Sequence, residues 1–95
     1  METIVIDGAG LASRAAVHDY LSARLGLPDC YGRNLDALYD CLTERPGPIR
    51  LLVRGLPDLE AALGGYAAAL WETLEAAARE NPGLEVVRQE EAEGR

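Results

Sequence analysis

The sequence predicts an α/β fold in which a small three-stranded parallel sheet packs against about four helices. Three short apolar runs, residues 3–7, 49–53 and 84–88, have the length and composition of strands. Between successive runs lie two segments with apolar side chains at helical spacing, so the expected order is β-α-α-β-α-α-β. Strands joined through helices favour parallel pairing with right-handed crossovers. Since three strands are too few for a broad doubly wound sheet, we expect the helices to pack largely against one face.

Turn signals separate the predicted strands from the helices. Residues 3–7 are a nearly continuous β-branched run, and this pattern predicts a strand that is buried on both faces. The second strand, 49–53, follows a Pro-Gly-Pro break at 46–48. The third strand, 84–88, follows an Asn-Pro-Gly break at 81–83.

Capping residues mark the first two helices. Ser13 is a good N-cap for the first, and Gly26 followed by Pro28 ends it. Asn34 caps a short second helix that extends to about Thr43. The apolar stripe of the first helix comprises Val17, Tyr20, Leu21 and Leu25.

Two further helices follow the second strand. Pro57 opens a short helix that stops at Gly64. Residues 66–80 form the longest helix, which is rich in Ala, and Trp71 within it is expected to pack between helix and sheet. One side of this helix is formed by Tyr66, Leu70, Leu74 and Ala77.

Length and charge restrict the function. The 95 residues are expected to form one domain, residues 1–95, in which residues 90–95 are a polar tail. A formal net charge of −7 repels phosphate backbones, so direct nucleic-acid binding is not expected, whereas a basic partner is attracted. No apolar run approaches the roughly 20 residues that span a bilayer, and the first residues show no secretory signal. We therefore expect a cytoplasmic protein without membrane contact.

Candidate metal ligands and nucleophiles are few. Cys30 and Cys41 are expected to be two thiols, because a reducing cytosol disfavours disulfides. With one His and no CxxC motif, the chain has too few ligands for a zinc site, and we expect no metal and no cofactor. His18 has no identifiable partner acid or nucleophile, which indicates a structural role.

The predicted second helix has one apolar and one acidic face. Three leucines define the buried face: Leu35, Leu38 and Leu42. The opposite face comprises Asp36, Tyr39, Asp40 and Thr43. Asp36 suits the positive end of the helix dipole, whereas Asp40 lies in the closing turn and four residues from a like charge. No Lys or Arg at positions 37, 43 or 44 offsets this, and such local conflicts tend to occur where function requires them.

Three kinds of function would use this face. Two carboxylates one turn apart could divide acid and base roles in an enzyme, but the sequence offers no nucleophile and too little protein to enclose a substrate. Asp36 and Asp40 could instead hold Mg²⁺, although such sites usually gain further ligands or a substrate phosphate. The third is a protein-binding surface whose carboxylates enter a cationic pocket of a partner. Net charge, chain length and an exposed Tyr39 favour this last hypothesis.

The segment PDCYGRNLDALYDCLT, residues 28–43, closely resembles the barstar family of intracellular inhibitors of the secreted bacterial ribonuclease barnase. Its string Tyr-Gly-x-Asn-Leu-Asp-Ala-Leu-aromatic-Asp-Cys-Leu is long and specific. A weaker resemblance extends over the whole chain, including the helix that contains His18. The resemblance implies a three-stranded parallel sheet with helices, and the function of an inhibitor rather than an enzyme.

The resemblance also implies roles for single residues. In that family the motif helix and the loop before it block the ribonuclease active site, with the aspartate matching Asp40 in the position of a substrate phosphate. Asp36 would have a supporting acidic role, and the ring of Tyr39 would pack against the partner. Glu75 is the nearest match to a family glutamate that faces the enzyme, its alternative role being a surface ion pair with Arg79. The expected partner-binding residues are Cys30, Tyr31, Gly32, Asn34, Asp36, Tyr39, Asp40, Thr43 and Glu75.

Several positions depart from the family pattern. Cys30 replaces an aromatic residue, Tyr39 replaces Trp, and Arg33 replaces an acidic residue, while no Trp follows the motif near Arg45. These changes imply a related but non-identical partner. We expect a one-to-one complex with a basic, extracellular-type ribonuclease. The alternative is a barstar-like fold that serves as an interaction or regulatory module for another basic protein or toxin.

Overall fold

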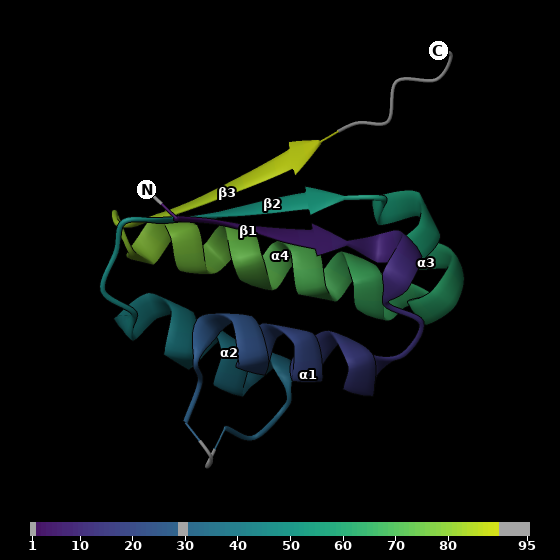
Figure 1. Ribbon diagram of the computed structural model, residues 1–95, viewed down its shortest axis with the longest axis horizontal. Helices are drawn as coiled ribbons and strands as arrows, with labels where there is room; N and C mark the ends of the chain where they lie inside the picture. The colour runs from purple at the N-terminus through teal and green to yellow at the C-terminus, as the bar shows by residue number, and fades with distance from the viewer. Residues whose placement is uncertain (1, 29–30, 90–95) are drawn as a thin grey trace.

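The computed structural model describes residues 2–28 and 31–89, so the predicted polar tail lies outside the described residues. The strands are β1 (Glu2–Asp7), β2 (Ile49–Arg54) and β3 (Leu84–Gln89). The helices are α1 (Arg14–Leu25), α2 (Leu35–Glu44), α3 (Leu56–Leu63) and α4 (Gly65–Glu80), with a 3₁₀ helix η1 (Gly8–Gly10) after β1. The order of strands and α-helices along the chain is the predicted one, and η1 is the element that the sequence did not predict (Figure 1).

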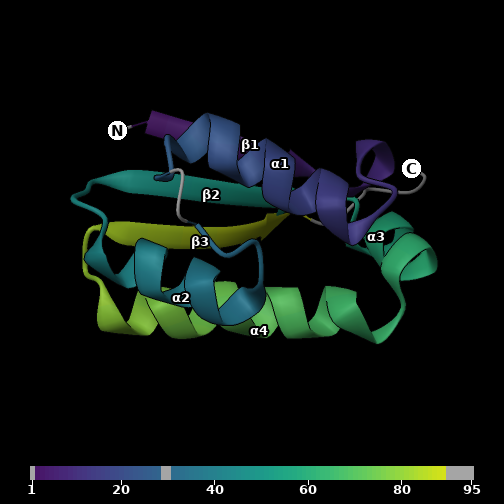
Figure 2. The same cartoon turned by 90° about the horizontal axis from the view of Figure 1, so that it is seen from below.

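The strands form a parallel sheet in the order β1-β2-β3. Figure 1 shows α1, α2 and α4 together on one side of this sheet, with α3 beyond the carboxyl ends of the strands. Figure 2 shows α2 and α4 side by side, while α1 lies on the β1 side of the sheet. The predicted α/β architecture, with its parallel sheet and one-sided helical layer, is therefore confirmed.

The prediction that the first strand is buried on both faces is wrong. Ile4 and Ile6 are fully buried, whereas Val5 between them is half-buried and Thr3 is exposed. Successive side chains of a strand point to opposite faces, and the helices cover only one face of this sheet. Leu52 of β2 is half-buried for the same reason. An apolar run in the sequence thus does not reveal that one face stays open.

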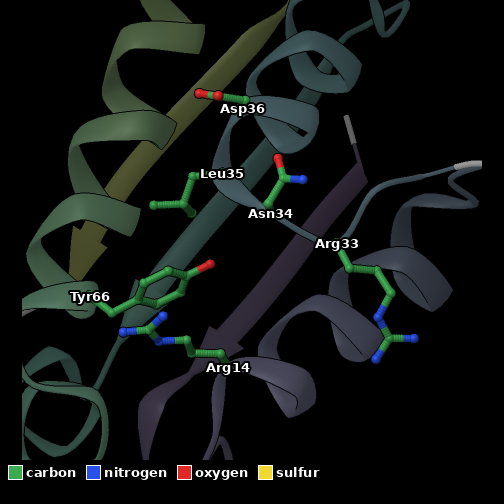
Figure 3. A pocket seen from close by; sticks show the side chains of 6 residues that line it. All are labelled: Arg14, Arg33, Asn34, Leu35, Asp36 and Tyr66. Atoms are coloured by element: carbon green, nitrogen blue, oxygen red, sulfur yellow. The ribbon is translucent and has the colours of Figure 1, made fainter.

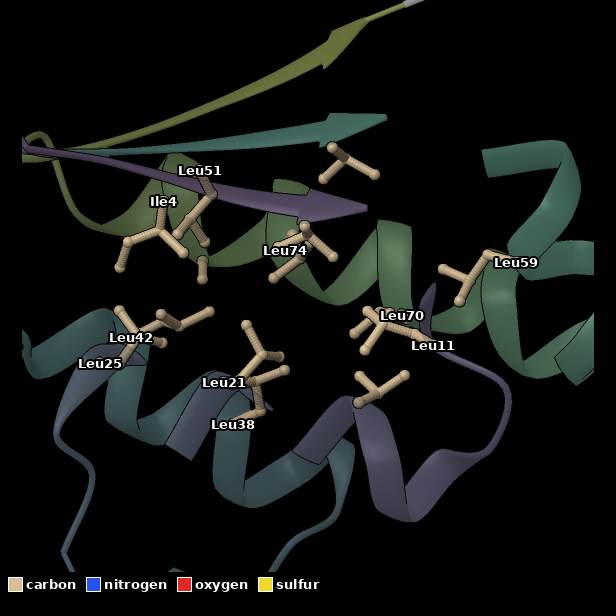
Figure 4. Packing of buried hydrophobic residues seen from close by; sticks show 14 of the residues in the cluster. Ile4, Leu11, Leu21, Leu25, Leu38, Leu42, Leu51, Leu59, Leu70 and Leu74 are labelled. Carbon is tan, nitrogen blue, oxygen red and sulfur yellow. The ribbon is translucent and has the colours of Figure 1, made fainter. Parts of the chain in front are cut away.

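The core lies between the sheet and the helical layer. Figure 4 shows Ile4 and Leu51 of the sheet directed toward side chains of α1, α2 and α4. The helices contribute, among others, Leu21, Leu25, Leu38, Leu42, Leu70 and Leu74. Trp71 is half-buried and packs against this core. Burial of these apolar side chains is the main force that fixes the helices on the sheet.

The capping residues behave as the sequence predicted. The side chain of Ser13 accepts a hydrogen bond from the backbone N–H of Ala16 at 3.0 Å and begins α1. The side chain of Asn34 accepts from the N–H of Ala37 at 2.8 Å and begins α2. Gly26 ends α1 with a φ of 64°, a left-handed conformation that favours glycine.

The carboxyl end of α2 is tied to the turn between α4 and β3 by Asn81. The Nδ2 of this buried side chain donates to the carbonyl oxygens of Leu42 and Arg45, both at 2.9 Å. Its Oδ1 accepts from the backbone N–H of Gly83 at 2.9 Å. One side chain therefore fixes the end of α2 relative to α4, and so the orientation of the face of α2 that points to solvent.

Candidate functional site

Helix α2 presents its two aspartates to solvent. Asp36 and Asp40 are both exposed, and Leu38 and Leu42 on the opposite side are fully buried. Tyr39 is half-buried, which leaves part of its ring available beside the aspartates. The division of α2 into an apolar and an acidic face therefore agrees with the sequence pattern.

Leu35 and Thr43 lie within α2, and Asn34 lies directly before it. Leu35, expected on the buried face, is half-buried. Thr43, expected on the exposed face, is also half-buried, and its Oγ1 donates to the backbone carbonyl of Asp40 at 3.0 Å. Asn34 is exposed and serves as the N-cap, so its side chain positions the first turn of α2.

A groove separates α2 from α4. It has a volume of about 360 Å³ and is lined by Leu35, Asp36, Tyr39, Ala69, Glu72, Thr73 and Ala76. Asp36 and Glu72 thus bring carboxylates to the same groove from two helices, and Tyr39 of α2 also lines it. The small side chains of Ala69 and Ala76 leave the space that the groove occupies.

Glu72 is the acidic residue of this groove that sequence reasoning missed. Glu75, the glutamate chosen by resemblance, is exposed but does not line the groove, so its contact with a partner stays a prediction. In the sequence, Ala69, Glu72 and Ala76 follow one another at intervals of three and four residues, which is helical spacing. That spacing defines a face of α4, but it does not reveal that α2 lies beside it.

The loop before α2 is held by a buried polar cluster. Tyr31 is only 8% exposed, and its Oη lies 2.5 Å from Nδ1 of His18. The other ring nitrogen of His18, Nε2, lies 2.6 Å from Oη of Tyr66 on α4. In a neutral imidazole one nitrogen donates and the other accepts, so one hydroxyl accepts from His18 and the other donates to it. His18 thus has the structural role predicted for it, whereas a direct contact of Tyr31 with a partner stays a prediction.

The surroundings of this cluster favour its uncharged form. Burial lowers the pKa of His18, the Arg33 guanidinium lowers it further, and the Asp19 carboxylate acts in the opposite direction. Burial raises the pKa of Tyr31 to about 12, with smaller contributions of the same sign from Cys41 and Tyr66. At neutral pH the cluster therefore holds the loop through hydrogen bonds rather than through charge.

Gly32 and Arg33 of this loop are exposed. The carbonyl of Gly32 accepts from Nδ2 of Asn34 at 3.2 Å. Arg33 has a φ of 58°, in the left-handed region, and its guanidinium pairs with Asp19 at 2.5 Å. Cys30, which the sequence placed at the partner surface, lies outside the described residues.

A second hollow also has Leu35 and Asp36 in its lining. It has a volume of about 510 Å³ and is lined by Arg14, Arg33, Asn34, Leu35, Asp36 and Tyr66 (Figure 3). Its side chains come from α1, from the loop before α2, from the first turn of α2 and from the start of α4. The groove between α2 and α4 therefore shares Leu35 and Asp36 with this hollow, which two arginines help to line.

Residues 2–28 and 31–89 contain neither a metal-binding cluster of three or more His, Cys, Asp and Glu side chains nor a helix that could span a membrane. Asp36 and Asp40 therefore gain no third such ligand within these ranges.

Comparisons with known proteins agree with the geometry. The family model described as "Barstar (barnase inhibitor)" matches residues 1–92. The chain is 40% identical over 81 residues to "Putative ribonuclease inhibitor YrdF" of Bacillus subtilis (strain 168), a match that covers 84% of this chain and 89% of that protein. A match over nearly the whole chain, on a three-stranded parallel sheet with helices on one face, identifies this protein as a member of the barstar family of barnase inhibitors.

Proposed function

We propose that this protein inhibits a small secreted bacterial ribonuclease by placing the acidic face of α2 in its active site. The complex has one inhibitor and one enzyme, and it forms in the cytoplasm. Asp40 occupies the position of a substrate phosphate, with Asp36 beside it and Tyr39 packed against the enzyme. The protein itself performs no catalysis. Membership of a family of barnase inhibitors supports ribonuclease inhibition in general.

The observation that supports this mechanism best is the exposure of both aspartates on one helix that is anchored from behind. Leu38 and Leu42 hold α2 in the core, and Asn81 fixes its carboxyl end. The carboxylates are therefore presented on a rigid element, which lowers the loss of conformational freedom when a partner binds.

Within residues 2–28 and 31–89, the Asp40 carboxylate has no ion-pair partner. It lies four residues from Asp36, and the last turn of α2 contains no basic residue. A ribonuclease active site offers cations that bind phosphate, and a guanidinium binds a carboxylate through two parallel hydrogen bonds in a similar way. An enzyme would therefore supply the charge that α2 lacks.

The overall charge favours the same partner. A net charge of −7 attracts a basic enzyme over a distance of about 8–10 Å at physiological ionic strength. The association rate is therefore expected to fall as salt concentration rises.

Inhibition titrations test the proposal. Barnase and other small secreted bacterial ribonucleases are titrated with the wild-type protein, with Asp40→Ala and with Glu60→Ala, an exposed acid of α3 that serves as a charge-matched control. We expect stoichiometric inhibition by the wild type and by Glu60→Ala. Because breaking a buried ion pair costs about 3–5 kcal/mol, Asp40→Ala should weaken inhibition by about a hundredfold or more.

Thermal unfolding of both variants completes the test. Asp40→Ala should be at least as stable as the wild type, because it removes a like-charge pair at i, i+4. Undiminished inhibition by Asp40→Ala would contradict the proposed role of this carboxylate. A clear loss of stability in this variant would show that Asp40 serves the fold instead.

A further inference from the structure

The hollow lined by Arg14 and Arg33 is the feature of this surface that the phosphate-mimicking face does not explain. Figure 3 shows Arg14 below the ring of Tyr66, and Arg33 on the other side of Asn34. Both arginines are exposed, and they reach the hollow from α1 and from the loop before α2. They line the same hollow as Asp36 of α2.

Arg14 is held in place without being neutralised. Its guanidinium carbon lies 4.3 Å from the centre of the Tyr66 ring, and that ring is itself fixed by the hydrogen bond to His18. Within residues 2–28 and 31–89, the Arg14 guanidinium has no ion pair. A stacked guanidinium keeps its N–H groups available at the edge, where a carboxylate can bind.

Arg33 is also available to a partner. Its ion pair with Asp19 joins two side chains that are 53% and 61% exposed, and such solvated pairs contribute little to stability. Its backbone adopts a left-handed conformation, which L-residues other than Asn and Asp rarely adopt, and Asn34 and α2 follow directly. The chain therefore keeps a large cationic side chain at a backbone position that favours Gly or Asn.

The surface that faces a ribonuclease is thus divided by charge. Asp36 and Glu72 line the groove between α2 and α4, and Asp36 also borders the hollow with its two arginines. An enzyme surface that is basic throughout would be repelled by Arg14 and Arg33. We propose that this hollow takes an acidic side chain that the ribonuclease carries beside its basic active site, and that Arg14 and Arg33 thereby select among ribonucleases.

This inference rests on the proposed function and names a further property of the partner. A phosphate group of RNA is the other anion with suitable chemistry. The net charge of −7 repels the many phosphates of an RNA backbone, so a single carboxylate of a protein partner is favoured.

The test combines inhibition titrations with double-mutant cycles. Barnase and other small secreted bacterial ribonucleases are titrated with the wild type, Arg14→Gln, Arg33→Gln, the double variant and Arg50→Gln. Arg50 is an exposed arginine of β2 whose partner is Glu85, so its variant makes the same change of charge away from the hollow. Acidic residues on the active-site face of each inhibited ribonuclease are then changed to their amides one at a time.

We expect the double variant to bind at least one inhibited ribonuclease at least tenfold more weakly than the wild type does. The affinity of Arg50→Gln for the same enzyme should be unchanged. One acidic residue of that enzyme should show at least fivefold coupling to Arg14 or Arg33. The inference is overturned if the affinity of every inhibited ribonuclease for the double variant is within threefold of its affinity for the wild type, while Asp40→Ala still abolishes inhibition. In that case the proposed function stands.

Two further outcomes would overturn the proposal. If the wild type inhibits none of the ribonucleases, the proposed function fails and this inference fails with it. A short single-stranded RNA oligonucleotide is finally added without any ribonuclease, and the Nε–H resonances of Arg14 and Arg33 are followed by NMR. Saturable shifts of both resonances would assign the hollow to phosphate and overturn the proposal of a protein carboxylate.

Discussion

His18 and Tyr31 are joined by a buried hydrogen bond of 2.5 Å between Nδ1 and Oη, although they belong to α1 and to the loop before α2. The same imidazole reaches Tyr66 of α4 with its second nitrogen at 2.6 Å. Three segments that are distant in sequence thus meet at one side chain. The loop that leads into the acidic helix is positioned by this cluster, and its protonation state should affect the stability of the protein.

Stability should fall as the pH falls through the ordinary titration range of histidine, around pH 6.5. An unfolded chain binds a proton on His18 near the ordinary pKa of 6.5, whereas the folded protein holds this pKa lower through burial and Arg33. The unfolded state therefore binds more protons in this interval, and stability is lost as pH decreases. Urea unfolding of the wild type and of His18→Gln checks this, because the variant should show a weaker dependence in the same interval. If the free energy of unfolding depends equally on pH in both proteins, His18 is not the group responsible.

Stability should also fall as the pH rises from about 10 to 12. The unfolded chain loses the Tyr31 proton near pH 10.0, and the folded protein retains it to about pH 12. Stability is therefore lost as the pH rises through this interval. Alkaline titration of tyrosinate absorbance should show a late-titrating phenol that is missing in Tyr31→Phe. The prediction is wrong if the wild type and Tyr31→Phe show the same late-titrating phase in this alkaline titration.

Asn81→Ala should destabilise the fold. The substitution removes the donors to the carbonyls of Leu42 and Arg45 and the acceptor for Gly83. Buried polar groups without partners cost about 1–3 kcal/mol, so a loss of at least this size is expected in the free energy of unfolding. Chemical denaturation checks the value, with the exposed Gln89→Ala as control. A change of similar size in both variants would show that the Asn81 bonds contribute little.

Glu72→Gln should weaken ribonuclease inhibition more than Glu75→Gln. Both changes remove one negative charge from α4, so the long-range attraction to a basic enzyme changes equally. Only Glu72 lines the groove beside Asp36 and Tyr39, where a charged hydrogen bond to the enzyme would form. Loss of such a bond corresponds to about a tenfold weakening for Glu72→Gln, against less than about twofold for Glu75→Gln. The reverse order of inhibition constants would favour the glutamate identified by resemblance.

Local patterns account for what could be predicted. Ser13 and Asn34 begin helices because their side chains bind backbone groups three residues away, and Gly26 ends one through its own backbone conformation. The acidic face of α2 was predictable for the same reason, since Asp36 and Asp40 are neighbours one helical turn apart. Such interactions depend on residues that are close in the chain.

Other features could not be predicted from local patterns. The half-exposure of Val5 depends on which face of the sheet the helices cover, and an apolar run is compatible with one covered face or two. The burial of Tyr31 was missed because its partner, His18, lies thirteen residues earlier in another helix. Neither fact is visible within a window of a few residues.

The sequence by itself determined the order of strands and helices, the caps and the acidic face of α2, because caps and helical periodicity act over a few residues. Only the tertiary structure decided that Glu72 rather than Glu75 lines the groove with Asp36, and that Arg14 and Arg33 both line one hollow. The physical reason is that hydrophobic periodicity fixes which side of a helix is buried but not which element covers it. That choice follows from how the whole core packs, and it places side chains from distant parts of the chain on one surface.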